Sequence, residues 1–204
     1  SNSTDVSSYV PFYPNQRAIC RDITRRIHVV WRYSVDTIAY ANSSDGITWN
    51  VDYSIINTTG EKRSPPSISC DGNNITVAYV NVSGSSHDLV VFISTDNGAT
   101  WTMKLPSVTN DLGNSVIIER RGQRIYIVYD MSSTDSDIRF INSTDGGNTW
   151  GAEEIIMNGA ARSNDDPSGV GNYYSNPSIV VDGTGSNNDK IYAVAKNGYC
   201  TVYN

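Results

Sequence analysis

Short segments of alternating apolar and polar residues follow one another along the whole chain, and the pattern occurs four times. One strand of the repeat occupies residues 26–33, 74–80, 124–130 and 190–196, and the next occupies 37–42, 89–94, 138–143 and 199–204. A third lies upstream, where a branched apolar residue precedes an acid by three positions, in 18–22, 67–71, 115–119 and 178–182. A period of two is typical of β-strands with one buried face. We therefore predict an all-β chain.

A turn of recurring sequence follows the third strand of each complete repeat. It reads STDNGATW at 94–101, STDGGNTW at 143–150 and, one residue shorter, SSDGITW at 43–49, and its aspartates lie 51 and 49 residues apart. Ser and Asp side chains hold the backbone amides of tight turns, and Gly permits positive φ. A period near fifty predicts a four-stranded meander repeated around an axis, which is a β-propeller blade.

The repeated turn resembles the Asp-box, or BNR repeat, of sialidases and other secreted propellers. In those families the boxes lie on the face away from the active site, so the resemblance implies a structural role for the matching residues. A diverged copy of the box lies at the start of the chain, where Ser3, Asp5 and Tyr9 have the same spacing as the Ser, Asp and Trp of the box at 43–49. The box residues are Ser3, Asp5, Tyr9, Ser43, Asp45, Trp49, Ser94, Asp96, Gly98, Trp101, Ser143, Asp145, Gly147 and Trp150.

The repeat divides the chain, taken as one domain of residues 1–204, into blades at 13–57, 58–108, 109–157 and 174–204, with an insertion loop at 158–173. Residues 1–12 read as a fourth strand that lacks its own blade, and the last blade lacks its fourth strand. We expect the two ends to complete one blade, either in a closed ring of four blades or by exchange with a neighbouring subunit. A larger ring of which these blades are a part is the third alternative, because sialidase propellers have six blades.

Composition and charge narrow the function classes. The formal net charge is −6, which argues against a nucleic-acid surface, and no run of eighteen apolar residues predicts insertion into a membrane. Six N-x-S/T sequons favour a glycosylated extracellular or surface protein, at Asn2, Asn42, Asn57, Asn74, Asn81 and Asn142. Three cysteines allow at most one disulfide; Cys20 and Cys70 lie on inner strands of adjacent blades, where a bridge is allowed, and Cys200 would stay free.

The loops at the end opposite the boxes form the candidate ligand face. Its residues are Arg63, Asp88, Asp130, Asp135, Asp137, Tyr173 and Tyr174. The acids of residues 130–137 have the spacing of Ca²⁺ ligands, or they belong to solvated turns. The adjacent tyrosines of the insertion are suited to stacking on a sugar ring.

Catalytic machinery is not evident. The sialidase resemblance implies three arginines, a tyrosine nucleophile activated by a glutamate, and an acid/base aspartate, but only Arg63 in RSPP faintly matches the arginine motif, and no glutamate clearly accompanies a tyrosine on the ligand face. We therefore predict no catalytic residues, metal site or cofactor, and a structural or interaction module that binds protein partners or itself. The alternatives are a carbohydrate-binding module and a sialidase-like glycoside hydrolase.

Overall fold

The computed structural model describes residues 17–56, 60–62, 64–108, 112–131, 137–158, 175–183, 185–186, 188–196 and 199–203. Within these ranges the chain forms strands and turns and no helix, so the predicted all-β class is confirmed. The strands are β1 (Ile19–Arg21), β2 (Ile27–Arg32), β3 (Ile38–Ser43), β4 (Asn50–Ile56), β5 (Glu61–Lys62), β6 (Ser67–Asp71), β7 (Asn74–Ser83), β8 (Ser86–Ser94), β9 (Thr102–Lys104), β10 (Leu112–Arg121), β11 (Arg124–Met131), β12 (Ile138–Ser143), β13 (Glu154–Met157), β14 (Ser175–Asp182), β15 (Lys190–Lys196) and β16 (Tyr199–Tyr203).

The strands form four antiparallel sheets in chain order. The first sheet is β1–β4, the third is β10–β13 and the fourth is β14–β16. The second sheet is β6–β9 with one addition, because the long strand β7 pairs with β6 along its first half and with β5 along its second. The sequence did not predict β5. The order of strands in each repeat is the predicted one.

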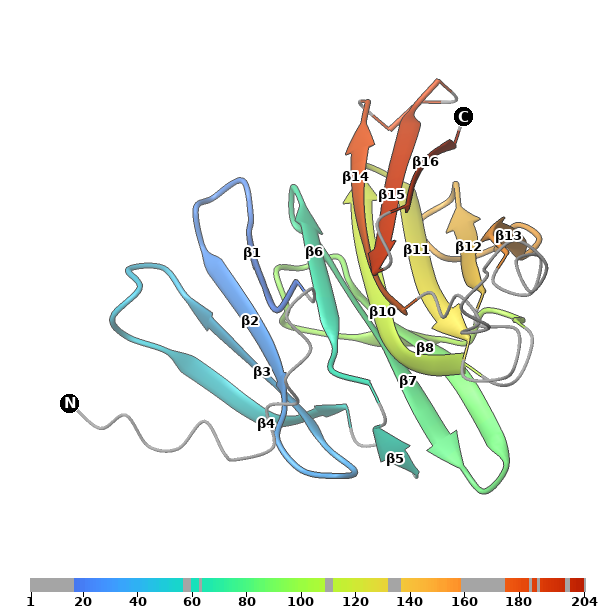
Figure 1. The fold of residues 1–204 in the computed structure, drawn as a ribbon. Helices are drawn as coiled ribbons and strands as arrows, with labels where there is room; N and C mark the ends of the chain where they lie inside the picture. The colour runs from blue at the N-terminus through green and yellow to red at the C-terminus, as the bar shows by residue number, and fades with distance from the viewer. Residues whose placement is uncertain are drawn as a thin grey trace.

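The four sheets follow one another with their first strands nearest the middle, so that β1 lies against β6, β6 against β10 and β10 against β14 (Figure 1). We call each contact between consecutive sheets a seam. Among the described strands, none of the first sheet pairs with the fourth, so the predicted closed ring is not present in this part of the chain. The predicted closing strand, 1–12, and the insertion loop after Asn158 lie outside the described residues.

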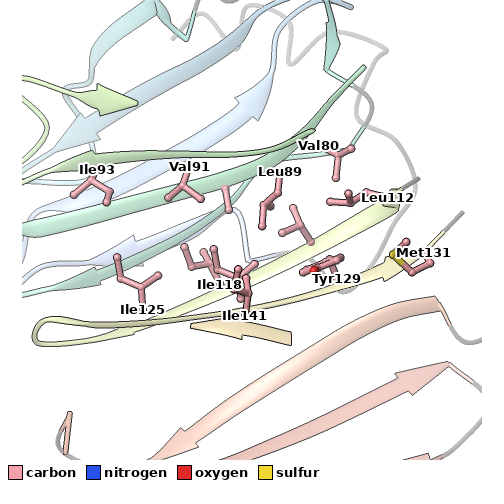
Figure 2. Close-up of a cluster of buried hydrophobic side chains, with 13 residues drawn as sticks. Val80, Leu89, Val91, Ile93, Leu112, Ile118, Ile125, Tyr129, Met131 and Ile141 are labelled. Carbon is pink, nitrogen blue, oxygen red and sulfur yellow. The ribbon is translucent and has the colours of Figure 1, made fainter. Parts of the chain in front are cut away.

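Each seam contains its own hydrophobic core. In the seam between the second and third sheets, side chains of both sheets point toward one another (Figure 2). Its members include Ala78, Val80, Leu89, Val91 and Ile93 from one side and Leu112, Ile118, Ile125, Ile127, Tyr129 and Ile141 from the other. Each fully buried aliphatic side chain contributes about 1.5–3 kcal/mol relative to an exposed one. An inner sheet therefore buries both faces, whereas the first and fourth sheets bury only one.

Polar side chains close the same seam near the axis. The amides of Ile118 and Arg120 on β10 donate to the hydroxyls of Ser67 (3.2 Å) and Ser69 (3.0 Å) on β6, and the amide of Gly122 donates to Asp71. These amides point away from β11, so without β6 they would form an unpaired sheet edge. The serines thus join two blades while they satisfy buried backbone donors.

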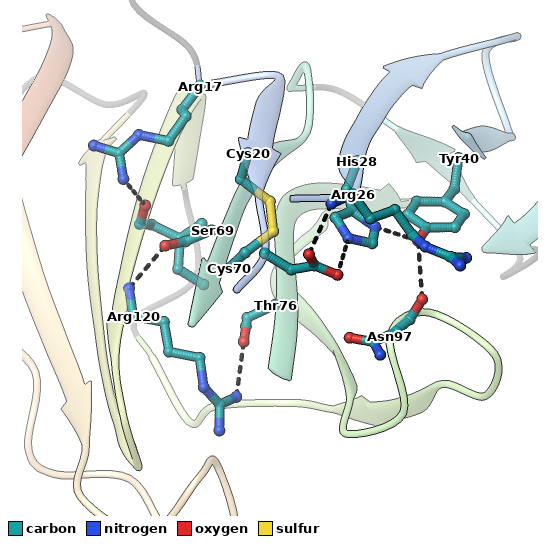
Figure 3. Close-up of a disulfide and its surroundings, with 12 residues drawn as sticks. Arg17, Cys20, Arg26, His28, Tyr40, Ser69, Cys70, Thr76, Asn97 and Arg120 are labelled. Atoms are coloured by element: carbon teal, nitrogen blue, oxygen red, sulfur yellow. Dashed lines mark hydrogen bonds and ion pairs between the residues drawn. A yellow bond between two sulfur atoms is a disulfide. The ribbon is translucent and has the colours of Figure 1, made fainter. Parts of the chain in front are cut away.

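A disulfide joins the first seam. Cys20 of β1 and Cys70 of β6 are bonded, with their Cα atoms 5.7 Å apart, so the bridge that the sequence allowed is formed (Figure 3). Chain-entropy arguments give a bridge that closes a 50-residue loop a stabilisation of about 4 kcal/mol. Cys200 lies in β16.

The inner strand of the third blade is offset from its sequence alignment. Aligning the repeats on their acids makes Val116 the equivalent of Ile68. In the structure the equivalent residue is Ile118, because Ile118 pairs with Ile127 on β11 as Ile68 pairs with Val77 on β7. The cause is the position of the hairpin between the first two strands of the blade. Its first strand ends at the acid Asp71 in the second blade, but at Arg121, two residues after the acid Glu119, in the third. This part of the predicted alignment was wrong by two positions.

The boxed turns show the hydrogen bonds expected of a scaffold. Ser94 donates to Asp96 (2.8 Å) and accepts from the amide of Gly98 (2.8 Å), while Thr100 donates its amide and its hydroxyl to Asp96. The turn at 143–150 repeats the same set of bonds, and the shorter turn at 43–49 keeps its Ser–Asp and amide bonds. The bonds to Thr100 lower the pKa of Asp96 to about 2, so this carboxylate is an acceptor rather than a proton donor.

The boxes also contact the preceding blade. Gly98 has a φ of +85° and lies against the Tyr40 hydroxyl, where a Cβ atom would overlap it; Gly147 faces Ile93 in the same way. Trp101 packs on the core of the first seam and Trp150 on that of the second, whereas no sheet among the described residues precedes Trp49, which is 39% exposed. The tryptophan of a box therefore acts between blades.

We expect Trp101→Ala to lower the free energy of unfolding by about 3 kcal/mol, because it removes indole packing from a seam. The indole N–H makes no hydrogen bond to the described residues, so the substitution tests packing. Trp49→Ala is the matched control and should change the value by about 1 kcal/mol or less in dilute solution. Urea unfolding measures both, and equal losses would contradict a role between blades.

Candidate functional site

The structure describes three residues of the predicted ligand face, Asp88, Asp130 and Asp137. Asp88 lies in β8 and accepts the Ser86 hydroxyl (2.7 Å). Asp130 and Asp137 lie at the facing ends of β11 and β12, where the amide of Met131 donates to the Asp137 carbonyl (3.0 Å). The other four residues, Arg63, Asp135, Tyr173 and Tyr174, lie outside the described ranges.

Asp130 is an internal acceptor at this end of the third seam. It is only 6% exposed and accepts the amide of Ser115 (2.8 Å), whose hydroxyl donates to the side chain of Asn176 (3.0 Å). Burial raises the pKa of Asp130 to about 6, although backbone amides including those of Ser115 and Asn176 oppose the rise. Both β10 and β14 are bulged here, and Asn176 has a φ of +52°. Asp130 therefore holds together two irregular strand starts.

A tyrosine–glutamate pair that the sequence did not predict lies beside Asp130: Tyr129 precedes it in β11, and Glu153 directly precedes β13. The Tyr129 hydroxyl donates to Glu153, and Arg139 binds Glu153 (2.8 Å) and Asp137 (3.4 Å). This is the pair of residue types that a sialidase nucleophile requires. However, Tyr129 is fully buried in the second seam, and burial followed by the bond to Glu153 raises its pKa above the usual value. A protonated, enclosed phenol is not a nucleophile.

A second buried network crosses the first seam, beside the disulfide (Figure 3). His28 lies between Asp22 (Nε2 to Oδ2, 3.1 Å) and the Tyr40 hydroxyl (Nδ1 to Oη, 2.6 Å), and Tyr40 lies 3.4 Å from the Asn97 carbonyl of the next box. His28, Asp22 and Tyr40 are each 6% exposed or less. The network has the acid–histidine pair of many hydrolases, but it is enclosed in the first seam, where Tyr40 packs against the Trp101 ring of the next box.

The charges of this network follow from its surroundings. Burial lowers the pKa of His28, and the hydrogen bond with Asp22 opposes that shift only in part. Burial alone would raise the pKa of Asp22, but hydrogen bonds from Thr24, His28 and the amide of Arg26 hold it below the usual value. A neutral His28 donates from Nε2 to the Asp22 carboxylate and accepts a hydrogen bond from the Tyr40 hydroxyl at Nδ1.

The predicted sequons differ in exposure. Asn42 and Asn81 are buried in β3 and β7, and Asn42 accepts a hydrogen bond from Arg26 (3.1 Å). Asn74 and Asn142 are half-buried, and Asn2 and Asn57 lie outside the described residues. Within the ranges described, no three His, Cys, Asp or Glu side chains are grouped as metal ligands, and no helix has the length and apolar character to cross a bilayer.

Comparisons with solved structures identify the type of fold. The chain is similar to the fucose-binding lectin of Aleuria aurantia, a six-bladed β-propeller, with 16% identity and a TM-score of 0.59 over 91% of this chain and 56% of the lectin. It is also similar to a Dyadobacter fermentans protein of unknown function, with 12% identity and a TM-score of 0.61 over 91% of this chain and 59% of that protein. The NanB sialidase of Streptococcus pneumoniae is similar too, with 14% identity and a TM-score of 0.57 over 89% of this chain and 27% of the sialidase. These likenesses show a β-propeller fold.

The chain spans less than three fifths of the length of these structures. No protein-family profile and no curated protein sequence matches it.

The buried histidine predicts how stability depends on pH. In the unfolded chain His28 has a pKa near 6.5, and in the folded chain its pKa is lower. The contribution of His28 to the free energy of unfolding therefore falls as the pH drops below 6.5. We expect His28→Gln to destabilise the protein more at pH 7.5 than at pH 5.5, as measured by urea unfolding. Equal destabilisation at both values would contradict a neutral, buried His28.

Asp130 acts in the opposite direction and needs its own control. Its pKa rises from 3.8 to about 6 on folding, so its contribution to stability grows as the pH falls through that window. Measuring His28→Gln in an Asp130→Asn background separates the two groups.

Proposed function

We propose that this chain is a non-catalytic propeller module that binds carbohydrate at the end opposite the boxed turns. The observation that carries the proposal is the state of Tyr129, which bonds to Glu153 as a sialidase nucleophile bonds to its activator but is fully buried in the second seam. A propeller of this kind has the fold that the fucose lectin and the sialidase share, without an exposed nucleophile in its described part.

The contacts of the boxed turns favour a structural role for their end of the blades and a binding role for the opposite end. Each box uses its aspartate as an acceptor for its own turn. The boxes at 94–101 and 143–150 also place a glycine and a tryptophan against the preceding blade. We propose on this basis that the turns are Asp-boxes. We propose that the loops at the other end recognise the ligand, and that Tyr173 and Tyr174, which the sequence assigns to those loops, offer flat apolar faces for a sugar ring.

An extracellular location fits the same proposal. The Cys20–Cys70 bridge is of a kind that persists in oxidising compartments. Of the described sequons, Asn74 at the start of β7 and Asn142 in β12 retain exposed surface, and we propose them as the glycosylated positions ahead of the buried Asn42 and Asn81.

The carbohydrate-binding proposal predicts binding without turnover. Titration calorimetry with α-methyl-L-fucoside and with a sialyllactose should detect at least one complex in the micromolar to millimolar range, and a fluorogenic sialoside should remain intact. The double substitution Tyr173→Ala, Tyr174→Ala should abolish the binding. Ile47→Ala, which changes an 85% exposed apolar residue of a boxed turn, should leave it unchanged.

Two results would overturn this assignment. Hydrolysis of the sialoside that is lost on Tyr129→Phe would show an enzyme. Absence of binding across a glycan array, with a folded chain by circular dichroism, would favour a purely structural or protein-binding module.

A further inference from the structure

The first sheet presents an uncovered apolar face on the side away from the second sheet. Strand pairing places Ile19, Val29, Ala41 and Val51 in one row across all four strands. Ile19 is 57% exposed and Val51 is 38% exposed. Beside this row, the rings of Trp31 and Tyr33 on β2 contact Tyr53 on β4, with centroids 6.3 and 4.9 Å from that of Tyr53.

The equivalent row of the second sheet shows what such a face is for. Ile68, Val77 and Phe92 occupy the same register positions as Ile19, Val29 and Ala41, and all three are buried against the first sheet. Tyr79, at the position of Trp31, is fully buried as well. Box tryptophans follow the same rule, since Trp101 lies in a seam and Trp49 does not. The exposed face therefore has the composition and register of a seam that lacks its preceding sheet.

The fourth sheet presents the complementary surface. Val180 and Val194 are 60% and 44% exposed on the side away from the third sheet. In the three earlier sheets the strand residue at the position of Val194 is Val30, Ala78 or Val128, each at most 1% exposed because the following sheet covers it. This second face is a seam that lacks its following sheet.

We propose that a second copy of this chain covers these faces, with the fourth sheet of one copy packed on the first sheet of the other. The two faces are those that pack together, in the same order, in all three seams of the chain. Both stay exposed in one copy, with the first and fourth sheets at opposite ends of the series (Figure 1). The contact joins two different surfaces, so it either closes into a ring or continues as a linear assembly.

Sedimentation velocity of the intact chain tests this assembly, with one charge placed on each face. Ile19→Asp should block the first-sheet face and Val180→Asp the fourth-sheet face, each weakening association by about 30-fold or more. If the assembly is a two-copy ring, each variant still has one usable face. A mixture of the two variants should then form a 1:1 dimer that neither forms alone at the same concentration. Leu105→Asp, a 61% exposed position that follows β9 of the second sheet and lies outside both faces, should associate like the intact chain.

Three outcomes would overturn the proposal. The intact chain could be monomeric at 100 μM or more, as closure of the ring within one chain would require. Both variants could associate unchanged, which would place the contact elsewhere. The mixture could fail to form a dimer while circular dichroism shows both variants folded, which would exclude contact between these two faces.

Discussion

The structure depends on the packing of consecutive sheets face to face. A four-stranded antiparallel sheet is too small to bury its own apolar face, so each blade is stable only against its neighbours. The three seams use different chemistry for the same task. The first has a disulfide and a buried histidine network, the second a core lined by Ser67 and Ser69, and the third the Asp130 link to Asn176. The boxed turns at 94–101 and 143–150 belong to the same scheme, because their glycines and tryptophans contact the preceding blade.

The same constraint buries side chains that could otherwise react. His28 and Tyr129, two side chains of the types that enzymes use for catalysis, are fully buried and hydrogen-bonded inside the structure. Glu153, the partner of Tyr129, is held in an ion pair with Arg139. Loops at the ends of strands generally lie on the surface and make fewer buried contacts than the strands do. Asp130 shows the limit of that rule, since it was predicted from its loop as a ligand-face residue and instead holds two bulged strands.

The fold was predictable because its signals are local. Alternating residues set each strand, and the boxed turn recurs at a near-constant spacing, so the strand order followed from the repeat. The repeat also allowed the Cys20–Cys70 bridge without deciding it. The offset of Ile118 was not predictable from the acids, because two extra residues before a hairpin shift register without changing the pattern. The Tyr129–Glu153 pair was missed because its members are 24 residues apart and meet only when strands are placed in space. Strand β5 is two residues long, too short to show a period.

Hydrogen exchange at the second seam tests the account most directly. The amides of Ile118 and Arg120 are bonded to serine side chains of the adjacent blade, not to their own sheet. If seams hold the molecule together, both amides exchange only with global unfolding, and Ser69→Ala speeds exchange of the Arg120 amide by about tenfold or more. Ser86→Ala, in the β8 turn, should leave it unchanged. Rapid exchange of both amides in the intact chain, or no response to Ser69→Ala, would show that the blades are stable independently of their seams.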